Sequence, residues 1–310
     1  MSRDNRLPIL VTGAHRSGTT WVGRMLAASG EATYISEPLN RWHRPGVLLV
    51  PVKRWYPYIC IDNQAEYFPA LRQMLELHYH TWAEVRSLHS LKDLLRMGRD
   101  VSAFTKGRLY RQRPLLKDPF AVYSAPWFAQ VLDCQVVITV RHPAGFASSL
   151  KRLNWPFNFH DLLDQPLLMR DWLEPYREEM QAMLLQDDII GQSALLWKTI
   201  YHAVACFQER YPQFQVVRHE DLSLEPVQGF HTLYAGLGLQ FTPLVEQTIL
   251  RSSSAENPAE ASVSDLYATQ INSRAGLYNW KRRLTSQEIE RIYELTIDVA
   301  HQYYPEAEWE

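Results

Sequence analysis

Cysteine is scarce in this chain, whose 310 residues include only Cys60, Cys134 and Cys206. The three lie far apart and form no C-x-x-C pair, so neither a disulfide framework nor a cysteine-based metal site is expected. An odd, sparse set of this kind favours reduced thiols and a cytoplasmic location.

Long apolar runs and an excess of one charge are also missing. Residues 1–6 are polar, and the apolar run of residues 7–11 is too short for a signal-peptide core or a transmembrane segment. A formal net charge of -2 argues against a dedicated nucleic-acid binder. With 46% hydrophobic and 21% charged residues, the composition is that of an ordinary soluble globule. We therefore expect residues 1–310 to form one large α/β domain.

The rest of the chain is organised around residues 7–30. Residues 7–11 have the composition of a buried parallel strand. A loop containing Gly13 and Gly18 follows, and apolar residues at helical spacing then run to Gly30, which we expect to cap a helix. A strand, a glycine loop and a helix in this order form a phosphate cradle, because the loop N–H groups and the positive end of the helix dipole face the same point.

This loop has the glycine spacing of the Walker A pattern, G-x-x-x-x-G-K-[ST], but lacks its lysine. Thr19 and Thr20 follow Gly18 directly, and a cation stands two residues before Gly18, at Arg16. We therefore expect the loop to bind an anion without the lysine that reaches the β/γ-phosphates of a nucleoside triphosphate. A glycine turn that binds nothing is the alternative for so short a pattern.

At this loop the chain resembles a known family, the sulfotransferases that use 3′-phosphoadenosine 5′-phosphosulfate (PAPS). The resemblance is to their 5′-phosphosulfate loop, and the residues that carry it are Arg16, Ser17, Gly18, Thr19, Thr20 and Trp21. Cytosolic members usually carry Lys at the first of these positions, whereas carbohydrate, tyrosylprotein and many bacterial members carry Arg. The resemblance implies a P-loop-type three-layer α/β fold with a central parallel sheet flanked by helices.

Three later segments extend the resemblance to the donor nucleotide. Arg141 precedes Ser149 by eight residues, which matches the family's 3′-phosphate motif. His219 opens a segment similar to the Tyr-Glu-Asp-Leu signature near the adenine, with His in place of Tyr; a histidine that only caps a strand is an equal alternative. Arg274 begins a segment similar to the Arg-Lys-Gly element at the 3′-phosphate, although that segment is one residue shorter and lacks the middle lysine.

Two predicted strands end in residues suited to catalysis. Glu37 follows the strand of residues 33–35, and the carboxyl ends of parallel strands meet at the ligand edge of a sheet. A solvated glutamate before a turn is the alternative, but carbohydrate sulfotransferases have a similar Glu-Pro here, and the resemblance makes Glu37 the catalytic base. Lys117 is expected to meet a phosphosulfate oxygen, and a solvated lysine beside Asp118 is the alternative. Pro119 stands where cytosolic members have their catalytic histidine, so the base must come from elsewhere, with Asp118 as the second candidate.

Other elements complete the expected fold. Strands are predicted at residues 114–116, 136–140 and 214–218, and helices at residues 65–79, 84–98, 144–153 and 191–210. Residues 41–112 and 154–190 are expected to be acceptor-facing insertions, because they combine aromatic, basic and proline residues or carry no donor motif. Aromatic anchors that only pin loops to the core are the alternative.

Together these features predict a sulfotransferase that moves a sulfuryl group from PAPS to an acceptor hydroxyl. Glu37 is the expected base, Arg16 and Lys117 stabilise the charge that develops, and no metal is required. The expected acceptor is a carbohydrate or glycoconjugate, and no nucleic-acid partner is expected. A P-loop kinase or NTPase and a non-catalytic nucleotide-binding protein remain the alternatives, and neither the exact acceptor nor the oligomeric state follows from the sequence.

Overall fold

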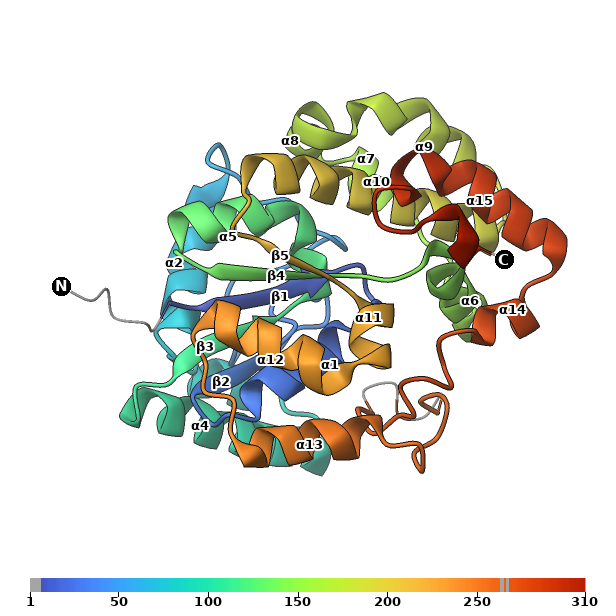
Figure 1. Cartoon of the computed structure of the whole chain (residues 1–310). Coiled ribbons are helices and arrows are strands. Elements are labelled where there is room, and N and C mark those ends of the chain that lie inside the picture. Colours follow the sequence, from blue (N-terminus) through green and yellow to red (C-terminus); the bar gives the residue numbers. More distant parts are fainter. Residues whose placement is uncertain (1–6, 263–264, 266–267, 310) are drawn as a thin grey trace.

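A parallel β-sheet forms the centre of the chain (Figure 1). The computed structural model describes residues 7–262, 265 and 268–309, so the polar residues 1–6 lie outside it. Within the described residues the sheet has the order β2-β3-β1-β4-β5, and every neighbouring pair is parallel. Its strands are β1 (Ile9–Gly13), β2 (Ala32–Ser36), β3 (Arg113–Lys117), β4 (Gln135–Val140) and β5 (Gln215–Arg218). The predicted strands are confirmed.

Helices connect and cover these strands. The helices of the first half are α1 (Thr19–Ala27), α2 (Gln64–Leu75), α3 (Thr81–Val85), α4 (Leu91–Leu109), η1 (Pro119–Ser124), α5 (Ala125–Val131) and α6 (Pro143–Leu153). A group of short helices follows: α7 (His160–Leu163), α8 (Pro166–Leu168), η2 (Met169–Leu173), η3 (Glu174–Tyr176) and α9 (Arg177–Met183). The remaining helices are α10 (Ile189–Arg210), α11 (His219–Leu224), α12 (Pro226–Leu237), α13 (Pro243–Ser253), α14 (Asn279–Arg283), α15 (Ser286–Ala300) and η4 (Glu306–Glu308).

The alternation of side chains along β1 produces three layers, because successive residues of a strand point to opposite faces of the sheet. Ile9 and Val11 are buried in a cluster with residues of α1, α12 and α13. Leu10 is buried in the larger cluster on the other face, with residues of α5, α6 and α10. Figure 1 shows α1, α12 and α13 below the sheet and α5 and α10 above it. The predicted α/β fold with a central parallel sheet flanked by helices is confirmed.

Three predicted helix boundaries were wrong. The helix expected at residues 65–79 already ends at Leu75. The helix expected at residues 84–98 is interrupted, because α3 ends at Val85 and α4 begins at Leu91. Ser90 caps α4 by accepting a hydrogen bond from the backbone N–H of Asp93, which starts a new helix at this point. Helix α1 ends at Ala27, earlier than the predicted cap at Gly30.

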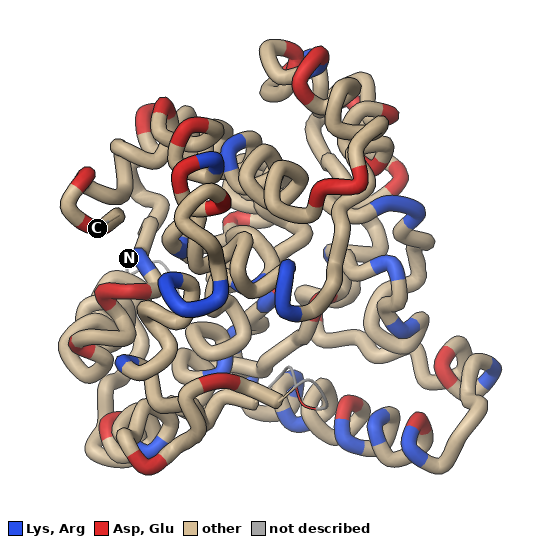
Figure 2. Tube along the Cα trace, turned by 90° about the vertical axis from the view of Figure 1, so that its right-hand side faces the viewer, with Lys and Arg blue, Asp and Glu red and all other residues tan. Residues whose placement is uncertain are grey.

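The fold brings the predicted catalytic and donor-binding residues to one edge of the sheet. Glu37 directly follows β2, Lys117 ends β3, Arg141 directly follows β4 and His219 directly follows β5. Because all strands are parallel, these positions lie at the same carboxyl edge, where the loop after β1 also lies. Seen from the side shown in Figure 2, Lys and Arg positions lie near the middle of the molecule. No helix of the described residues combines the length and apolarity that crossing a bilayer requires.

Candidate active site

The loop of residues 14–20, called the phosphosulfate loop below, joins β1 to α1. Gly18 has φ 94°, and a Cβ on it would lie 2.6 Å from Nδ1 of His219, so both the backbone conformation and the space require glycine. Helix α1 begins at Thr19 without a side-chain cap. Its first N–H groups therefore remain available to an anion at the positive end of the helix dipole.

The loop that contains Arg16 lies against the second donor motif, which consists of Arg141 and Ser149. Nε of Arg16 donates to Oγ of Ser149 over 3.3 Å. Nη1 of Arg141 donates to the backbone oxygen of Arg16 over 2.9 Å, and burial lowers the pKa of Arg141 from its ordinary value. Residues far apart in the sequence thus place two guanidinium groups and a hydroxyl together, which is the donor set that a phosphate group prefers.

A first cavity, called the donor cavity below, opens beside these groups with a volume of about 150 Å³. Its walls include the predicted donor-binding residues Arg16, Gly18, Thr19, Thr20, Trp21, Arg141, Ser149 and His219. Nε1 of Trp21 donates to Oγ of Ser252 over 2.9 Å, which fixes the indole in this wall. Burial lowers the pKa of His219 to about 3, and its Nδ1 has no hydrogen-bond partner within the described part of the chain. His219 is therefore a neutral ring with one ring nitrogen still unpaired beside the phosphosulfate loop.

Two predicted donor-binding side chains do not reach the donor cavity. The hydroxyl of Ser17 is fully buried, donates to the oxygen of Ala14 over 2.5 Å and lies 2.7 Å from Oγ1 of Thr139. The side chain of Ser17 therefore stabilises the loop by hydrogen bonds on the side away from the donor cavity. Arg274 directs its guanidinium at the backbone oxygen of Leu224, over 2.6 Å, and is not part of the cavity wall.

Sequence reasoning missed two charged residues of the donor cavity, Arg152 and Glu260. Glu260 forms a bidentate ion pair with Arg283, at 2.8 and 2.9 Å. Arg152 lies 3.8 Å from the same carboxylate. Arg152 comes one helical turn after Ser149 on α6, so a search for a second cation on that helix face could have found it. Nothing in the sequence signals Glu260.

A second cavity, called the acceptor cavity below, is also lined by residues of the phosphosulfate loop and has a volume of about 590 Å³. Arg16, Thr19 and Thr20 line both cavities. The acceptor cavity also contains Glu37 and residues from both predicted insertions, namely Arg41, Trp42, Trp55, Tyr56, Trp155, Pro156, Phe157, Asn158 and Asp161. The loop is thus the common wall of a polar cavity and a larger, partly aromatic one.

Glu37 is held in a fixed orientation at the acceptor cavity. Its Oε1 accepts a hydrogen bond from Nζ of Lys117, and its Oε2 accepts one from Nδ2 of Asn40 over 2.8 Å. Its backbone N–H donates to the oxygen of Lys117 over 2.7 Å. A carboxylate has about four acceptor positions, so each oxygen can still accept a hydrogen bond from a molecule in the cavity.

The other two candidates at the end of β3 lie behind Glu37. Lys117 is fully buried and belongs to neither cavity wall. Burial alone would lower its pKa, but the neighbouring Tyr34 and Glu37 outweigh this effect and raise it. Asp118 is also fully buried and accepts hydrogen bonds from the backbone N–H groups of Leu39, over 2.5 Å, and Phe120, over 2.9 Å. Burial raises the pKa of Asp118 to about 7, yet its carboxylate does not line the acceptor cavity.

Three residues around the acceptor cavity have left-handed backbone conformations, which side chains other than glycine rarely adopt. Arg16, Glu37 and Tyr56 have φ values of 67°, 50° and 55°. Such conformations cost about 1–3 kcal/mol each and persist where the surrounding contacts fix them, often at functional sites. Three of the seven non-glycine residues with positive φ in the described part of the chain thus line this cavity.

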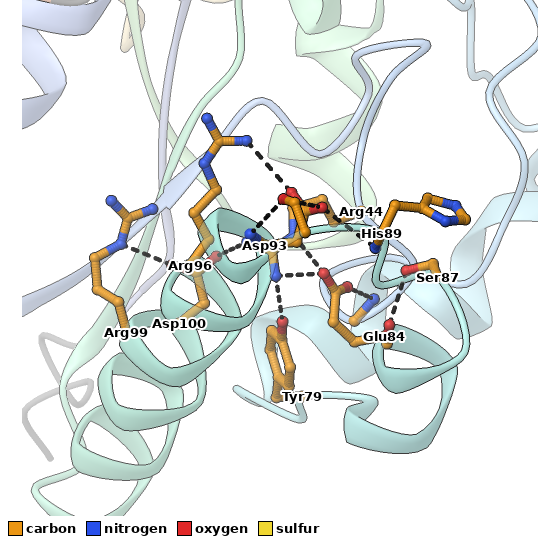
Figure 3. Close-up of polar contacts among 11 residues, drawn as sticks. Arg44, Tyr79, Glu84, Ser87, His89, Asp93, Arg96, Arg99 and Asp100 are labelled. Carbon is orange, nitrogen blue, oxygen red and sulfur yellow. Dashed lines mark hydrogen bonds and ion pairs between the residues drawn. The ribbon is translucent and has the colours of Figure 1, made fainter.

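A buried ion-pair network anchors the loop that carries one wall of the acceptor cavity (Figure 3). Arg44, shortly after Arg41 and Trp42, pairs with Glu84, whose side chain is only 2% exposed, and with Asp100 at 3.1 Å. The second oxygen of Glu84 accepts the backbone N–H of Gly46 over 2.7 Å. Glu84 of α3 and Asp100 of α4 thus hold the wall loop against these two helices.

A comparison with protein-family models assigns the chain to a family. Residues 8–243 match the family model described as the sulfotransferase family. The chain belongs to the sulfotransferase family. It is an enzyme of the sulfotransferase class, which the predicted motifs had indicated, and the kinase or NTPase alternative is not supported.

This sulfotransferase has distant curated relatives. It is 26% identical to carbohydrate sulfotransferase 3 of Mus musculus over 175 residues, which are 54% of this chain and 31% of that protein. It is 23% identical to carbohydrate sulfotransferase 5 of Homo sapiens over 345 aligned positions, which are 94% of this chain and 76% of that protein. The chain therefore spans about a third of the mouse relative and about three quarters of the human one. A solved sulfotransferase domain from the curacin biosynthetic pathway is 16% identical with a TM-score of 0.47, over 93% of this chain and 97% of that one.

Among residues 7–262, 265 and 268–309 there is no group of three or more His, Cys, Asp or Glu side chains arranged to hold a metal ion. The cationic side chains that line the donor cavity include Arg16, Arg141 and Arg152.

Proposed function

We propose that this sulfotransferase transfers the sulfuryl group of PAPS in line to a hydroxyl of a carbohydrate or glycoconjugate, with Glu37 as the general base. The observation that carries the proposal is the shared wall: Arg16, Thr19 and Thr20 line both cavities. A sulfuryl group bound by this loop would lie between a nucleotide in the donor cavity and a hydroxyl in the acceptor cavity. In-line transfer requires that arrangement.

The donor cavity offers side chains suited to separate parts of PAPS. Arg141 and Ser149 would bind the 3′-phosphate, because guanidinium and hydroxyl groups form short charge-assisted hydrogen bonds with phosphate. Trp21 would contact the adenine. At about 150 Å³ the cavity is smaller than the usual range for small-molecule sites, about 300–1,000 Å³, so we expect the wall residues from 259–261 and 268–276 to move outward when PAPS binds.

The acceptor cavity has the character of a saccharide site. Trp42, Trp55 and Trp155 supply flat apolar surfaces, on which the apolar faces of sugar rings pack. Asn40 and Asp161 supply hydrogen-bonding groups for hydroxyls. Two curated relatives are named carbohydrate sulfotransferases, which supports the same class of acceptor.

The residues then divide the chemistry between them. Glu37 takes the proton of the acceptor hydroxyl as the new O–S bond forms. The bond between sulfur and the bridging oxygen of the 5′-phosphate breaks, and 3′-phosphoadenosine 5′-phosphate leaves with the bonding electrons. Arg16 and the N–H groups at the start of α1 stabilise the negative charge on the transferring group and the leaving phosphate. Lys117, predicted to contact the phosphosulfate directly, instead orients Glu37 from behind.

The test is transfer of labelled sulfate from PAPS to a panel of polysaccharides, glycolipids and small alcohols. We expect label on a carbohydrate acceptor, no requirement for added divalent metal, and loss of transfer in Arg16→Ala. Glu66→Gln, an exposed change on α2, is the matched control that should transfer normally. Transfer only to non-carbohydrate alcohols would refute the acceptor class, and no transfer to any acceptor, although the protein binds the donor, would refute the enzymatic proposal.

A further inference from the structure

His15, the residue before Arg16, is a polar side chain of the acceptor cavity that the proposed mechanism does not use. Its ring is stacked on Phe120, with centroids 6.2 Å apart and planes at 24°, and meets Phe146 edge-on at 5.5 Å. These contacts fix the plane of the ring. His15 lines the acceptor cavity but, unlike Arg16, does not line the donor cavity.

The hydrogen bonds of Tyr56 determine which nitrogen of His15 carries the proton. Tyr56 is fully buried, and its Oη accepts the backbone N–H of His15 over 3.2 Å. Burial raises the pKa of the phenol well above its ordinary value, so Tyr56 keeps its own proton. The acceptor within hydrogen-bond reach is Nδ1 of His15, at 2.5 Å from Oη. Nδ1 therefore accepts, and the proton of the neutral ring lies on Nε2.

The ring of His15 is also held neutral. Burial, reinforced by the charge of Arg16, lowers its pKa to about 3. The remaining polar group of the ring is the Nε2–H, and none of the described residues forms a hydrogen bond with it. Since Nδ1 is engaged with Tyr56 and the ring lines the acceptor cavity, an oxygen atom of a bound molecule is the natural partner for this N–H.

We propose that His15 is an acceptor-binding residue, which donates its Nε2–H to an oxygen of the acceptor next to the reacting hydroxyl, and that Tyr56 is the positioning residue that locks the required tautomer. This inference rests on the proposed sulfuryl transfer. A donor directed at the reacting oxygen itself would reduce its nucleophilicity, so a neighbouring oxygen is the suitable partner. Glu37 and His15 then fix the acceptor at two points, one basic and one donating.

The test compares variants of His15 that place an N–H donor near the position of either Nε2 or Nδ1 of the imidazole. His15→Gln places an amide N–H near the position of Nε2, whereas His15→Asn places one only near Nδ1. We expect His15→Asn and His15→Ala to lower kcat/KM for the acceptor about fivefold to tenfold through a higher KM, as expected for losing one neutral hydrogen bond. His15→Gln should recover most of this loss. Tyr56→Phe should resemble His15→Ala, and the affinity for 3′-phosphoadenosine 5′-phosphate should be unchanged in all four variants.

Nitrogen-15 NMR of the histidine side chains gives a readout that does not depend on turnover. We expect His15 to be the Nε2–H tautomer at neutral pH in the wild type and a mixture of tautomers in Tyr56→Phe. A wild-type Nδ1–H tautomer, or equal acceptor KM in His15→Asn and His15→Gln, would overturn the proposal while leaving sulfuryl transfer intact. A fall in kcat of a hundredfold with unchanged acceptor KM would also overturn it, because the N–H would then act on the sulfuryl group. An inactive wild type refutes the proposed function itself.

Discussion

Replacing Glu37 by Gln tests the proposed base, and the structure shows why the single variant is not sufficient. Gln keeps the size of the side chain but cannot accept a proton, and its NH2 group can accept neither of the hydrogen bonds that Lys117 and Asn40 donate to the two carboxylate oxygens. Losing a general base lowers kcat about 10²–10⁴-fold. However, Glu37 also pairs with Lys117, which is fully buried. Removing one partner of a buried ion pair costs about 3–5 kcal/mol, because the other charge is left without compensation.

The two effects can be separated with a second substitution. Lys117→Met replaces the ammonium by an apolar side chain of similar length, so Glu37→Gln/Lys117→Met contains no unpaired charge. We expect urea denaturation to show that the double variant recovers most of the unfolding free energy lost in Glu37→Gln. Turnover, followed by labelled-sulfate transfer, should stay as low as in the single variant. The affinity for 3′-phosphoadenosine 5′-phosphate should remain near that of the wild type in both, because the carboxylate does not line the donor cavity.

One result would refute this reasoning. If the double variant regained near-normal turnover together with stability, Glu37 would serve only as the counterion of Lys117. The base would then have to be another residue, and Asp118, the second candidate, would need a movement that exposes its buried carboxylate. Asp118→Asn is therefore measured alongside, with a milder loss of turnover expected.

Three further predictions concern the donor, the pH dependence of stability and the wall loop. Arg141→Ala should remove most of the preference for 3′-phosphoadenosine 5′-phosphate over 5′-AMP. We expect calorimetry to show that the ratio of the two affinities falls about tenfold to a hundredfold, since a charge-assisted hydrogen bond contributes about 1.5–3 kcal/mol. Equal affinity of the wild type for both nucleotides would contradict the assignment. Burial lowers the pKa of His142 to about 3, so the folded state favours the neutral ring. The contribution of His142 to the stability of the fold is therefore fully present above pH 6.5, the ordinary pKa, and is lost as the pH falls toward 3. Relative to His142→Asn, which can still cap α6, the wild type should lose up to about 1.4 kcal/mol of unfolding free energy per pH unit between those limits, and parallel pH profiles would contradict this. Arg44→Met should lower the unfolding free energy, measured by urea denaturation, by about 3–5 kcal/mol, because it leaves the carboxylate of Glu84 without its ion-pair partner. Arg44→Met/Glu84→Gln should recover part of this loss. An Arg44→Met variant as stable as the wild type would show that the pair does not anchor the wall loop.

The sheet and the donor motifs could be predicted because their signals are local. A short apolar run of residues 136–140 can be read from composition alone, and the spacing from Arg141 to Ser149 lies within one strand-to-helix connection. Glu37 could be placed at the ligand edge because it directly follows a strand. The cytoplasmic location and the single-domain organisation of residues 1–310 stay predictions.

The role of Lys117 could not be predicted, because it depends on which strands are neighbours. The register that pairs Ser36 of β2 with Lys117 of β3 brings the ammonium beside the carboxylate of the next residue, Glu37. Sequence gives the strands but not their order or register. The direction of the Arg274 guanidinium, toward the backbone oxygen of Leu224, could not be predicted either, because Arg274 lies in a segment without regular secondary structure and the altered spacing of its motif sets no constraint on it.

The orientation of Glu37 therefore comes from residues on separate segments, and each controls a different degree of freedom. Lys117 fixes one carboxylate oxygen and Asn40 the other. Asp118 accepts the N–H of Leu39 and so holds the turn that keeps Glu37 at its left-handed φ of 50°. In the proposed mechanism, Asp118 would therefore act through the backbone that orients Glu37, although its own carboxylate does not line the acceptor cavity.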